Sequence, residues 1–210
     1  MKISVIMASW LGAPNRENLD KKFIRAVNSF LAQTHPDKEL IIVSDGCQKT
    51  KDLYESHFKN NPLIKFFMSA KQPMYSGGIR NIGLKMATGD IISYLDSDDV
   101  IGKDHLKIIN EEFDTTKWDW VYYNDFLTLN KEFTKFEKRI VRPAWSSIGT
   151  SSISHINFEK SDKFPNKPEW STGYGHDYLY AYTLASVSTK FTKLDKSSQY
   201  MACHYRNGDF

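Results

Sequence analysis

The stretch Ile91-Ile-Ser-Tyr-Leu-Asp-Ser-Asp-Asp99 decides the fold class. Its first five residues are mostly apolar, which is typical of a strand buried on both faces of a parallel sheet. Similar runs predict three earlier strands, over residues 3–8, 40–43 and 64–68. Helices are predicted from Leu19 to a stop near His35-Pro36 and over residues 50–58, 78–87 and 103–113, with apolar residues at helical spacing in the first and last of them. This alternation predicts an α/β fold with a mainly parallel, Rossmann-like sheet and helices on both faces.

The pattern loosens beyond about residue 117. Residues 118–129 and 133–141 are expected to form strands that pair with each other. Residues 143–175 are rich in Ser, Gly, Pro and Trp, which indicates long loops. A last helix is expected from His176 and a strand near Tyr200. The second half is therefore predicted to be a smaller region of mixed strands and loops within one domain of 210 residues.

Composition excludes several classes of protein. Hydrophobic residues make up 40% of the chain and aromatic residues 14%, as in a globular protein. The net charge of +3 gives no strong electrostatic case for a nucleic-acid partner. The locally basic stretch 131–142 is interpreted as a solvated edge in preference to the alternative, a binding patch. Cys47 and Cys203 are too few and too far apart for a disulfide framework or a zinc site. Because neither a signal peptide nor a transmembrane segment is apparent, we expect a cytoplasmic location.

Polar residues follow three of the predicted strands. Ser9-Trp10 follow the first, Asp45 the second, and Asp96 to Asp99 the fourth. Ligands of open parallel sheets bind at the carboxyl ends of the strands, so these groups should converge on one site.

The acidic cluster that begins at Asp96 has two interpretations. Three carboxylates in four residues repel one another, and a bound Mg²⁺ or Mn²⁺ would relieve that repulsion. Alternatively, Asp98 or Asp99 caps the helix that starts near Lys103 or forms a turn. Two nucleotide motifs are absent: no G-x-G-x-x-G follows the first strand, and Gly78 and Gly83 are not followed by Lys-Ser/Thr.

Five sequence pieces together resemble family 2 glycosyltransferases. The first half carries them in the family's order and spacing: Ile3-Ser-Val-Ile-Met-Ala-Ser-Trp10 with Leu31-Ala-Gln-Thr-His-Pro36, Glu39-Leu-Ile-Ile-Val-Ser-Asp-Gly46, Gly77-Gly-Ile-Arg-Asn-Ile-Gly83, Ala87-Thr-Gly-Asp90 and Tyr94-Leu-Asp-Ser-Asp-Asp99. The resemblance implies a GT-A-type fold and an inverting, metal-dependent transfer of a sugar from a nucleotide-sugar, of the UDP class, to a hydroxyl of a glycan or other acceptor. Residues 1–115 would bind the donor and residues 116–210 the acceptor.

The resemblance also assigns the nucleotide site. Ala8, Ser9 and Trp10 would wrap the nucleotide, mainly through backbone groups. Asp45 would hydrogen-bond the base, as the second acid of the family's Asp-Asp-Gly does. The first acid of that motif is Ser44 in this chain, which is a departure from the family pattern.

Donor phosphates and the metal would be held around the Asp-Ser-Asp motif. The resemblance implies that Arg80 approaches the base or the phosphates and that Asp96 contacts the ribose, with Ser97 beside it. Asp98 would bind Mn²⁺ or Mg²⁺ and, through the metal, the diphosphate. His204 is a candidate further metal ligand, because glycosyltransferases of this fold often place a late histidine there.

The catalytic base is expected in Gly175-His-Asp-Tyr178, which resembles the family's acidic pair after a glycine. Asp177 would remove the proton from the acceptor hydroxyl. His176, in place of the family's glutamate, is an acceptor-site residue and an alternative base. A structural alternative makes Asp177 the N-cap of the last helix. Trp170, like Trp145 and Tyr174, is an aromatic residue that could stack on an acceptor sugar or belong to the core.

Two rival functions fit the same strands and helices. A nucleotidyltransferase should show a Gly-rich loop with a basic residue directly after the first strand, which Ser9-Trp10-Leu11 does not. A donor-binding or scaffold domain without turnover would bind nucleotide and fail to transfer the sugar.

Overall fold

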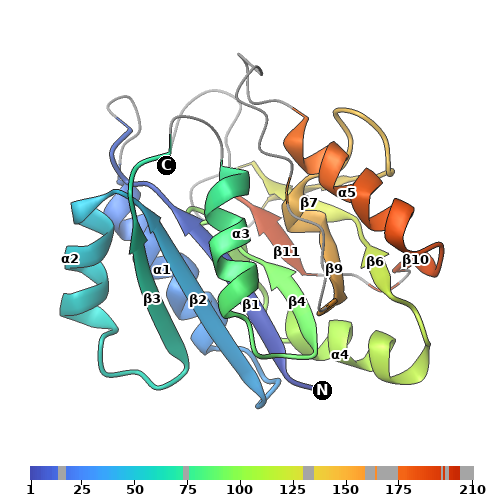
Figure 1. Cartoon of the computed structure of the whole chain (residues 1–210), viewed down its shortest axis with the longest axis horizontal. Coiled ribbons are helices and arrows are strands. Elements are labelled where there is room, and N and C mark those ends of the chain that lie inside the picture. Colours follow the sequence, from blue (N-terminus) through green and yellow to red (C-terminus); the bar gives the residue numbers. More distant parts are fainter. Residues whose placement is uncertain are drawn as a thin grey trace.

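The computed structural model describes residues 1–13, 18–72, 76–129, 135–158, 164, 175–194, 196 and 199–203. Within them the chain forms a seven-stranded sheet in the order β10-β6-β9-β4-β1-β2-β3 (Figure 1). Its strands are β1 (Ile3–Ser9), β2 (Lys38–Asp45), β3 (Ile64–Ser69), β4 (Ile91–Tyr94), β6 (Trp120–Tyr122), β9 (Ile153–Ile156) and β10 (Phe191–Lys193). Strands β4, β1, β2 and β3 run parallel, as does the β10–β6 pair. The predicted α/β class with a mainly parallel sheet is confirmed.

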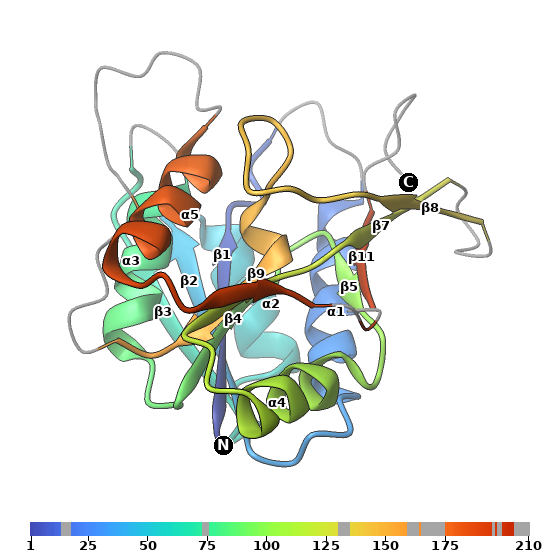
Figure 2. The same ribbon diagram turned by 90° about the vertical axis from the view of Figure 1, so that its right-hand side faces the viewer.

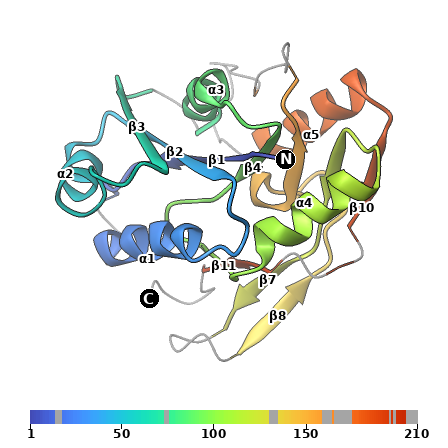
Figure 3. The same ribbon diagram turned by 90° about the horizontal axis from the view of Figure 1, so that it is seen from below.

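Five helices of the described chain cover the two faces of this sheet. They are α1 (Leu19–Leu31), α2 (Gln48–His57), α3 (Ser76–Met86), α4 (His105–Thr115) and α5 (His176–Val187). Figure 3 shows α1 and α4 on one side and α3 and α5 on the other. Helices α3 and α5 therefore share the face on which the candidate site is assembled.

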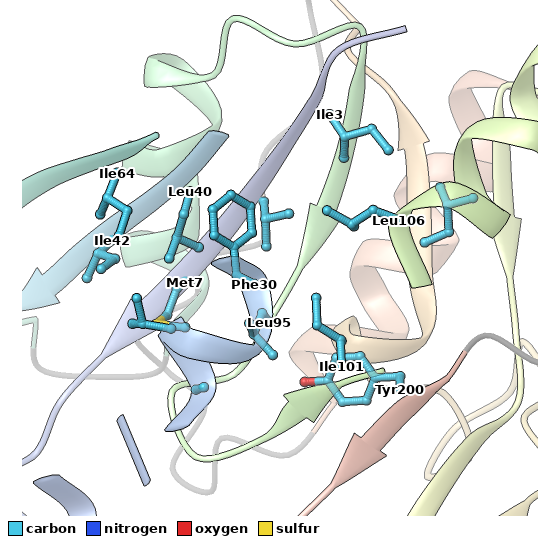
Figure 4. Close-up of a cluster of buried hydrophobic side chains, with 14 of the residues drawn as sticks. Ile3, Met7, Phe30, Leu40, Ile42, Ile64, Leu95, Ile101, Leu106 and Tyr200 are labelled. Carbon is cyan, nitrogen blue, oxygen red and sulfur yellow. The ribbon is translucent and has the colours of Figure 1, made fainter. Parts of the chain in front are cut away.

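Alternation along β1 divides the core between the two faces. Ile3, Val5 and Met7 belong to the cluster that packs under α1 and α4, part of which is drawn in Figure 4. Ile6 points to the opposite face and joins the cluster that contains Tyr94 and residues of α3 and α5. Because both faces are covered, β1 reads as a continuous apolar run, which explains why the sequence predicted it well.

A smaller sheet has the order β5-β11-β7-β8. Its strands are β5 (Val100–Ile101), β7 (Asp125–Thr128), β8 (Phe136–Arg139) and β11 (Tyr200–Ala202). Figure 2 shows this sheet beside α1, on the side away from α3 and α5. The expected pairing of strands in residues 118–141 is present between β7 and β8, which run antiparallel. Residues 118–129 do not form one strand, because β6 joins the large sheet and β7 the small one.

The prediction of long loops over residues 143–175 is wrong in one place. A single 3₁₀ turn (Thr150–Ser152) leads into β9, which lies antiparallel between β4 and β6. Ser154 and His155 are completely buried in this strand, and their polar atoms are hydrogen-bonded to Ser93, Tyr94 and Tyr180. Such a strand lacks an apolar run, so hydrophobic patterning could not detect it.

None of the helices in the described part of the chain is both long enough and apolar enough to cross a membrane.

Candidate active site at the carboxyl ends of the parallel strands

The first group of site residues lies where β1 and β2 end. Lys71 Nζ lies 4.6 Å from the centroid of the Trp10 ring and forms an ion pair with the Asp45 carboxylate. The backbone N–H of Gln72 donates to the other Asp45 oxygen at 2.6 Å. Asp45 is thus held by a cation and an amide, while 46% of Trp10 is exposed. An exposed indole beside an oriented carboxylate can hold a nucleotide base by stacking and hydrogen bonding.

The turn after β2 is shaped for this arrangement. Gly46 has φ +62°, and a Cβ at this position would lie 2.7 Å from the backbone nitrogen of Lys71. A side chain there would therefore push the Lys71 segment away from Asp45. Ser44, which departs from the family pattern, is buried; its hydroxyl donates to the Cys47 carbonyl and accepts from the Cys47 N–H. It therefore shapes the turn into α2.

The side chains of Ala8 and Ser9 face inward. Ser9 is 2% exposed, and its Oγ lies 3.2 Å from Thr50 Oγ1 of α2. Ala8 packs against the apolar cluster beneath α3. Both residues therefore offer mainly their backbone groups at the carboxyl end of β1.

Arg80 of α3 forms the second group of site residues. Its guanidinium is 5% exposed, and Nη2 donates to Asp96 Oδ1 at 2.7 Å. Nη1 donates to Ser76 Oγ at 2.7 Å and lies 3.6 Å from Asp177 Oδ1. Burial alone would lower the pKa of Arg80, but the Asp96 and Asp177 carboxylates raise it above its ordinary value. One permanent cation thus joins the loop after β4 to the start of α5.

Asp177 lies in the first turn of α5, and Gly175 occupies the N-cap position with φ +107°. The alternative that Asp177 caps the helix is therefore wrong. Its Oδ1 accepts a hydrogen bond from Thr150 Oγ1 and lies 3.0 Å from His176 Nε2. Burial would raise the pKa of Asp177, but the His176 hydrogen bond, the Arg80 charge and the Thr150 hydrogen bond lower it to about 2.

The contacts of Asp177 leave one carboxylate oxygen for chemistry. The hydrogen bonds and ion pairs that the described residues make to this side chain all use Oδ1. At neutral pH Asp177 is ionised, so Oδ2 can accept a proton or a hydroxyl hydrogen bond. His176 Nε2 also lies 3.1 Å from Arg80 Nη1, so the Arg80 guanidinium, the His176 imidazole and the Asp177 carboxylate lie within contact distance of one another.

Asp99, for which the sequence analysis considered a helix cap or a turn, is a buried structural residue. It is 1% exposed, accepts a hydrogen bond from the Tyr200 hydroxyl at 2.8 Å and another from the Cys203 N–H at 2.7 Å. The same hydroxyl accepts the Asp96 N–H at 3.1 Å. Burial raises the pKa of Asp99 well above its ordinary value, and the nearby Asp98 and Asp96 charges add to the effect. Asp99 therefore anchors the acidic loop to β11. It does not cap α4, whose N-cap position is Asp104.

The remaining acids of the loop have the donor chemistry of a hard-cation site. Asp96, Ser97 and Asp98 are partly exposed, and the Asp98 carbonyl accepts a hydrogen bond from Arg25. Carboxylate oxygens are the ligands that Mg²⁺ and Mn²⁺ prefer. No group of three or more His, Cys, Asp or Glu residues arranged for a metal occurs in the described parts of the chain. His204 lies outside those parts, as do Trp170 and Tyr174.

A buried hydrogen-bonded triad lies behind the site and was not predicted. The Tyr94 hydroxyl lies 2.9 Å from both His155 Nε2 and the Tyr180 hydroxyl, and Tyr180 lies 2.8 Å from the same histidine nitrogen. Burial lowers the pKa of His155 to about 4, so the ring is neutral. Phe164 stacks on Tyr180 with 3.7 Å between ring centroids and lies beneath the Arg80 guanidinium. The triad fixes α5 against β4, two residues before Asp96.

A cavity of about 420 Å³ opens on the other side of Asp177. Its walls include Arg139 at the end of β8, Trp145 and the loop that follows, and the start of α5. Asp177 therefore lies between the Arg80–Asp96 group and a separate hollow.

Known proteins share sequence and fold with this chain. Residues 15–171 match the family described as Glycosyl transferase family 2. An uncharacterized glycosyltransferase of Nostoc sp., alr2836, is 38% identical over 118 residues, which cover 55% of this chain and 34% of that protein. A Campylobacter jejuni GalNAc(5)-diNAcBac-PP-undecaprenol beta-1,3-glucosyltransferase is 30% identical over 99 residues, or 47% of this chain and 30% of that protein.

Solved structures show the same fold at low sequence identity. S. aureus TarS 1-349 in complex with UDP-GlcNAc superposes with a TM-score of 0.74 and 19% identity over 96% of this chain and 58% of that one. The chain spans about a third of the length of the Nostoc protein. Because the family match covers most of its residues, the chain belongs to glycosyl transferase family 2.

Proposed function

We propose that this domain transfers a sugar from a nucleotide-sugar, of the UDP class, to a hydroxyl of a glycan acceptor, with inversion and with a divalent metal. One observation carries the proposal: Arg80 links Asp96, directly after β4, to His176 and Asp177 at the start of α5. A buried cation between two carboxylates suits a site where a diphosphate leaves and a proton is removed.

Donor binding is assigned to the first half of the chain. The nucleotide base would lie by Trp10 and Asp45, which Lys71 holds together. Arg80 would pair with the diphosphate and Asp96 with the ribose. The UDP-GlcNAc complex of TarS, which has this fold, supports a UDP-sugar donor.

The metal assignment rests on the chemistry of the donor set. Asp98, with Asp96 beside it and His204 as a further candidate, would hold Mn²⁺ or Mg²⁺. The bound ion would neutralise charge on the departing diphosphate.

Asp177 is assigned as the base. As the acceptor oxygen bonds to the anomeric carbon, Oδ2 takes the hydroxyl proton and the nucleoside diphosphate leaves with the electrons of the broken bond. Arg80 would then move toward the diphosphate, which would weaken its hold on Asp177 and raise the basicity of that carboxylate. His176, 3.0 Å away, is the alternative base.

A nucleotide screen tests the proposal. Thermal unfolding is measured with UDP, GDP, CDP and dTDP, each with and without Mn²⁺. A ligand at a hundredfold excess over its Kd stabilises the folded state by about 2.7 kcal/mol. We expect a shift with UDP that requires the metal, and a weaker one in Asp98→Ala. A UDP shift that is independent of metal would contradict the metal assignment, and no shift with any nucleotide would contradict the donor site.

A further inference from the structure

The cavity beside Asp177 has the size and the walls of a binding site. Its volume of about 420 Å³ lies within the range of about 300–1,000 Å³ that is typical of small-molecule pockets. Asp177 forms part of one wall and Trp145 and Arg139 form others. The proposed base therefore faces a hollow that the donor-side residues Trp10, Asp45 and Asp96 do not line.

Trp145 is an exposed aromatic wall held in a fixed position. It is 58% exposed, and its ring meets the Tyr178 ring edge-on at 5.8 Å. A Cβ built on Gly175 would lie 2.2 Å from the Trp145 ring. The indole thus packs on the residue that begins α5, two positions before Asp177. A fixed indole in an open cavity gives a flat apolar surface for the C–H face of a sugar ring.

Arg139 is a preorganised cation on another wall. Its Nε donates to Asp125 Oδ1 at 2.7 Å, and Nη2 pairs with Oδ2 of the same carboxylate. Asp125 is completely buried and also accepts a hydrogen bond from Ser152, whereas the Arg139 side chain is 45% exposed. A guanidinium has five N–H donors, so this bidentate pair leaves donors for a ligand.

The chain segment that contributes Arg139 to the cavity wall is rich in basic residues. Residues 135–146 are exposed except Val141, and they carry Lys135, Lys138, Arg139 and Arg142 against the single acid Glu137. Of these charged residues, Arg139 lines the cavity. Asp125 is shielded from solvent, and Asp177 is engaged by Arg80. This local charge favours a ligand group with negative charge beside Arg139.

We infer that the cavity binds a glycan acceptor whose sugar lies on Trp145 and carries a phosphate or a carboxylate beside Arg139. The inference rests on the proposed function, because it makes this sugar the source of the hydroxyl that Asp177 deprotonates. It adds a substrate class, an anionic acceptor, to the proposed reaction.

Matched sugars test the inference directly. Binding of glucose, glucuronate and glucose 6-phosphate to the chain is measured by ligand-observed NMR titration. The wild type should bind at least one anionic sugar about tenfold more tightly than glucose, since a charge-assisted hydrogen bond has about that effect. The stronger of the two anionic sugars identifies carboxylate or phosphate as the recognised group.

Variants show which residues produce the preference for an anionic sugar over glucose. Arg139→Gln should abolish it, and Asp125→Asn/Arg139→Gln should do the same without leaving a buried carboxylate unpaired. Trp145→Ala should weaken all three sugars. The controls Lys107→Gln and Phe136→Ala, at exposed positions that do not line the cavity, should leave binding unchanged.

Two results would overturn the inference: equal binding of all three sugars by the wild type, or an anionic preference that survives in the double variant. The melting shift caused by UDP with Mn²⁺ is recorded on the same proteins. An intact shift without an anionic preference overturns the inference and spares the proposed function. A missing shift in the wild type counts against the proposed function itself.

Discussion

The donor side and the acceptor side of the site are held by different kinds of contact. Strands β1, β2 and β4 present Trp10, Asp45 and Asp96 from a sheet whose buried apolar residues form the two main core clusters. On the acceptor side, Arg139 is held by the buried Asp125, and α5 by the His155 triad. The local apolar sequence identifies the strands that present the donor site, whereas the elements around the acceptor site are held by polar pairs that lie far apart in the chain. We therefore expect substitutions on the acceptor side to lower turnover while leaving nucleotide binding on the donor side unchanged.

The largest separation should come from Asp177→Asn. The amide cannot accept the acceptor proton, and general-base catalysis typically contributes about 10²–10⁴ in rate. We expect kcat to fall by that factor while the UDP melting shift persists. Asp114→Asn, at an exposed position of α4, is the matched control. Turnover at the control rate would transfer the role of base to His176.

A stability effect should come from Glu39, at the amino end of the donor strands. Burial would raise the pKa of Glu39, but hydrogen bonds from Lys65, Ser4 and Thr88 lower it to about 2. Because the pKa is depressed in the folded state, the stabilisation is present above the unfolded value of about 4.3 and is lost as pH falls through about 2. It amounts to roughly 3 kcal/mol at neutral pH.

Urea unfolding of Glu39→Gln at several pH values measures this contribution. The variant should be less stable than the wild type at pH 7, and the gap should narrow steadily as the pH is lowered toward 2. Glu55→Gln, an exposed acid on α2, should show little difference at any pH. A difference in unfolding free energy between wild type and variant that stays constant with pH would contradict the depressed pKa assigned to Glu39.

The smallest effect should come from the triad on the acceptor side. His155→Phe keeps a ring but removes the two hydrogen bonds to Tyr94 and Tyr180, at a cost of about 1–3 kcal/mol. Loss of these bonds should weaken the packing of α5, so kcat should fall several-fold. The melting shift caused by UDP, measured against the variant without nucleotide, should be unchanged. A parallel loss of UDP binding would mean that the triad also supports the donor side.

Sequence patterns predicted the donor side better than the acceptor side for a physical reason. β1 and β2 are buried on both faces, so their composition alone identifies them. Asp99 and Tyr200, and likewise Tyr94 and His155, are partners that lie far apart in the chain. Each of these residues looks like an ordinary polar residue until its partner is known. The positions of Asp96, Arg80 and Asp177 were expected from the family resemblance, and they lie together in the folded chain.

The antiparallel strand β9 has a consequence for how the chain folds. It is the strand that connects β4 to β6 and, beyond it, to β10. Strands β1 to β4 can pair as soon as the first 94 residues are available, but the remaining strands have no place in the large sheet until residues 153–156 arrive. Until then β4 presents an open edge of Ile91 and Ile92, which is a surface that invites aggregation. Folding of this domain is therefore expected to proceed in two stages. Strands β1 to β4 pair first, and the pairing of β9 with β4 then allows β6 and β10 to join the sheet.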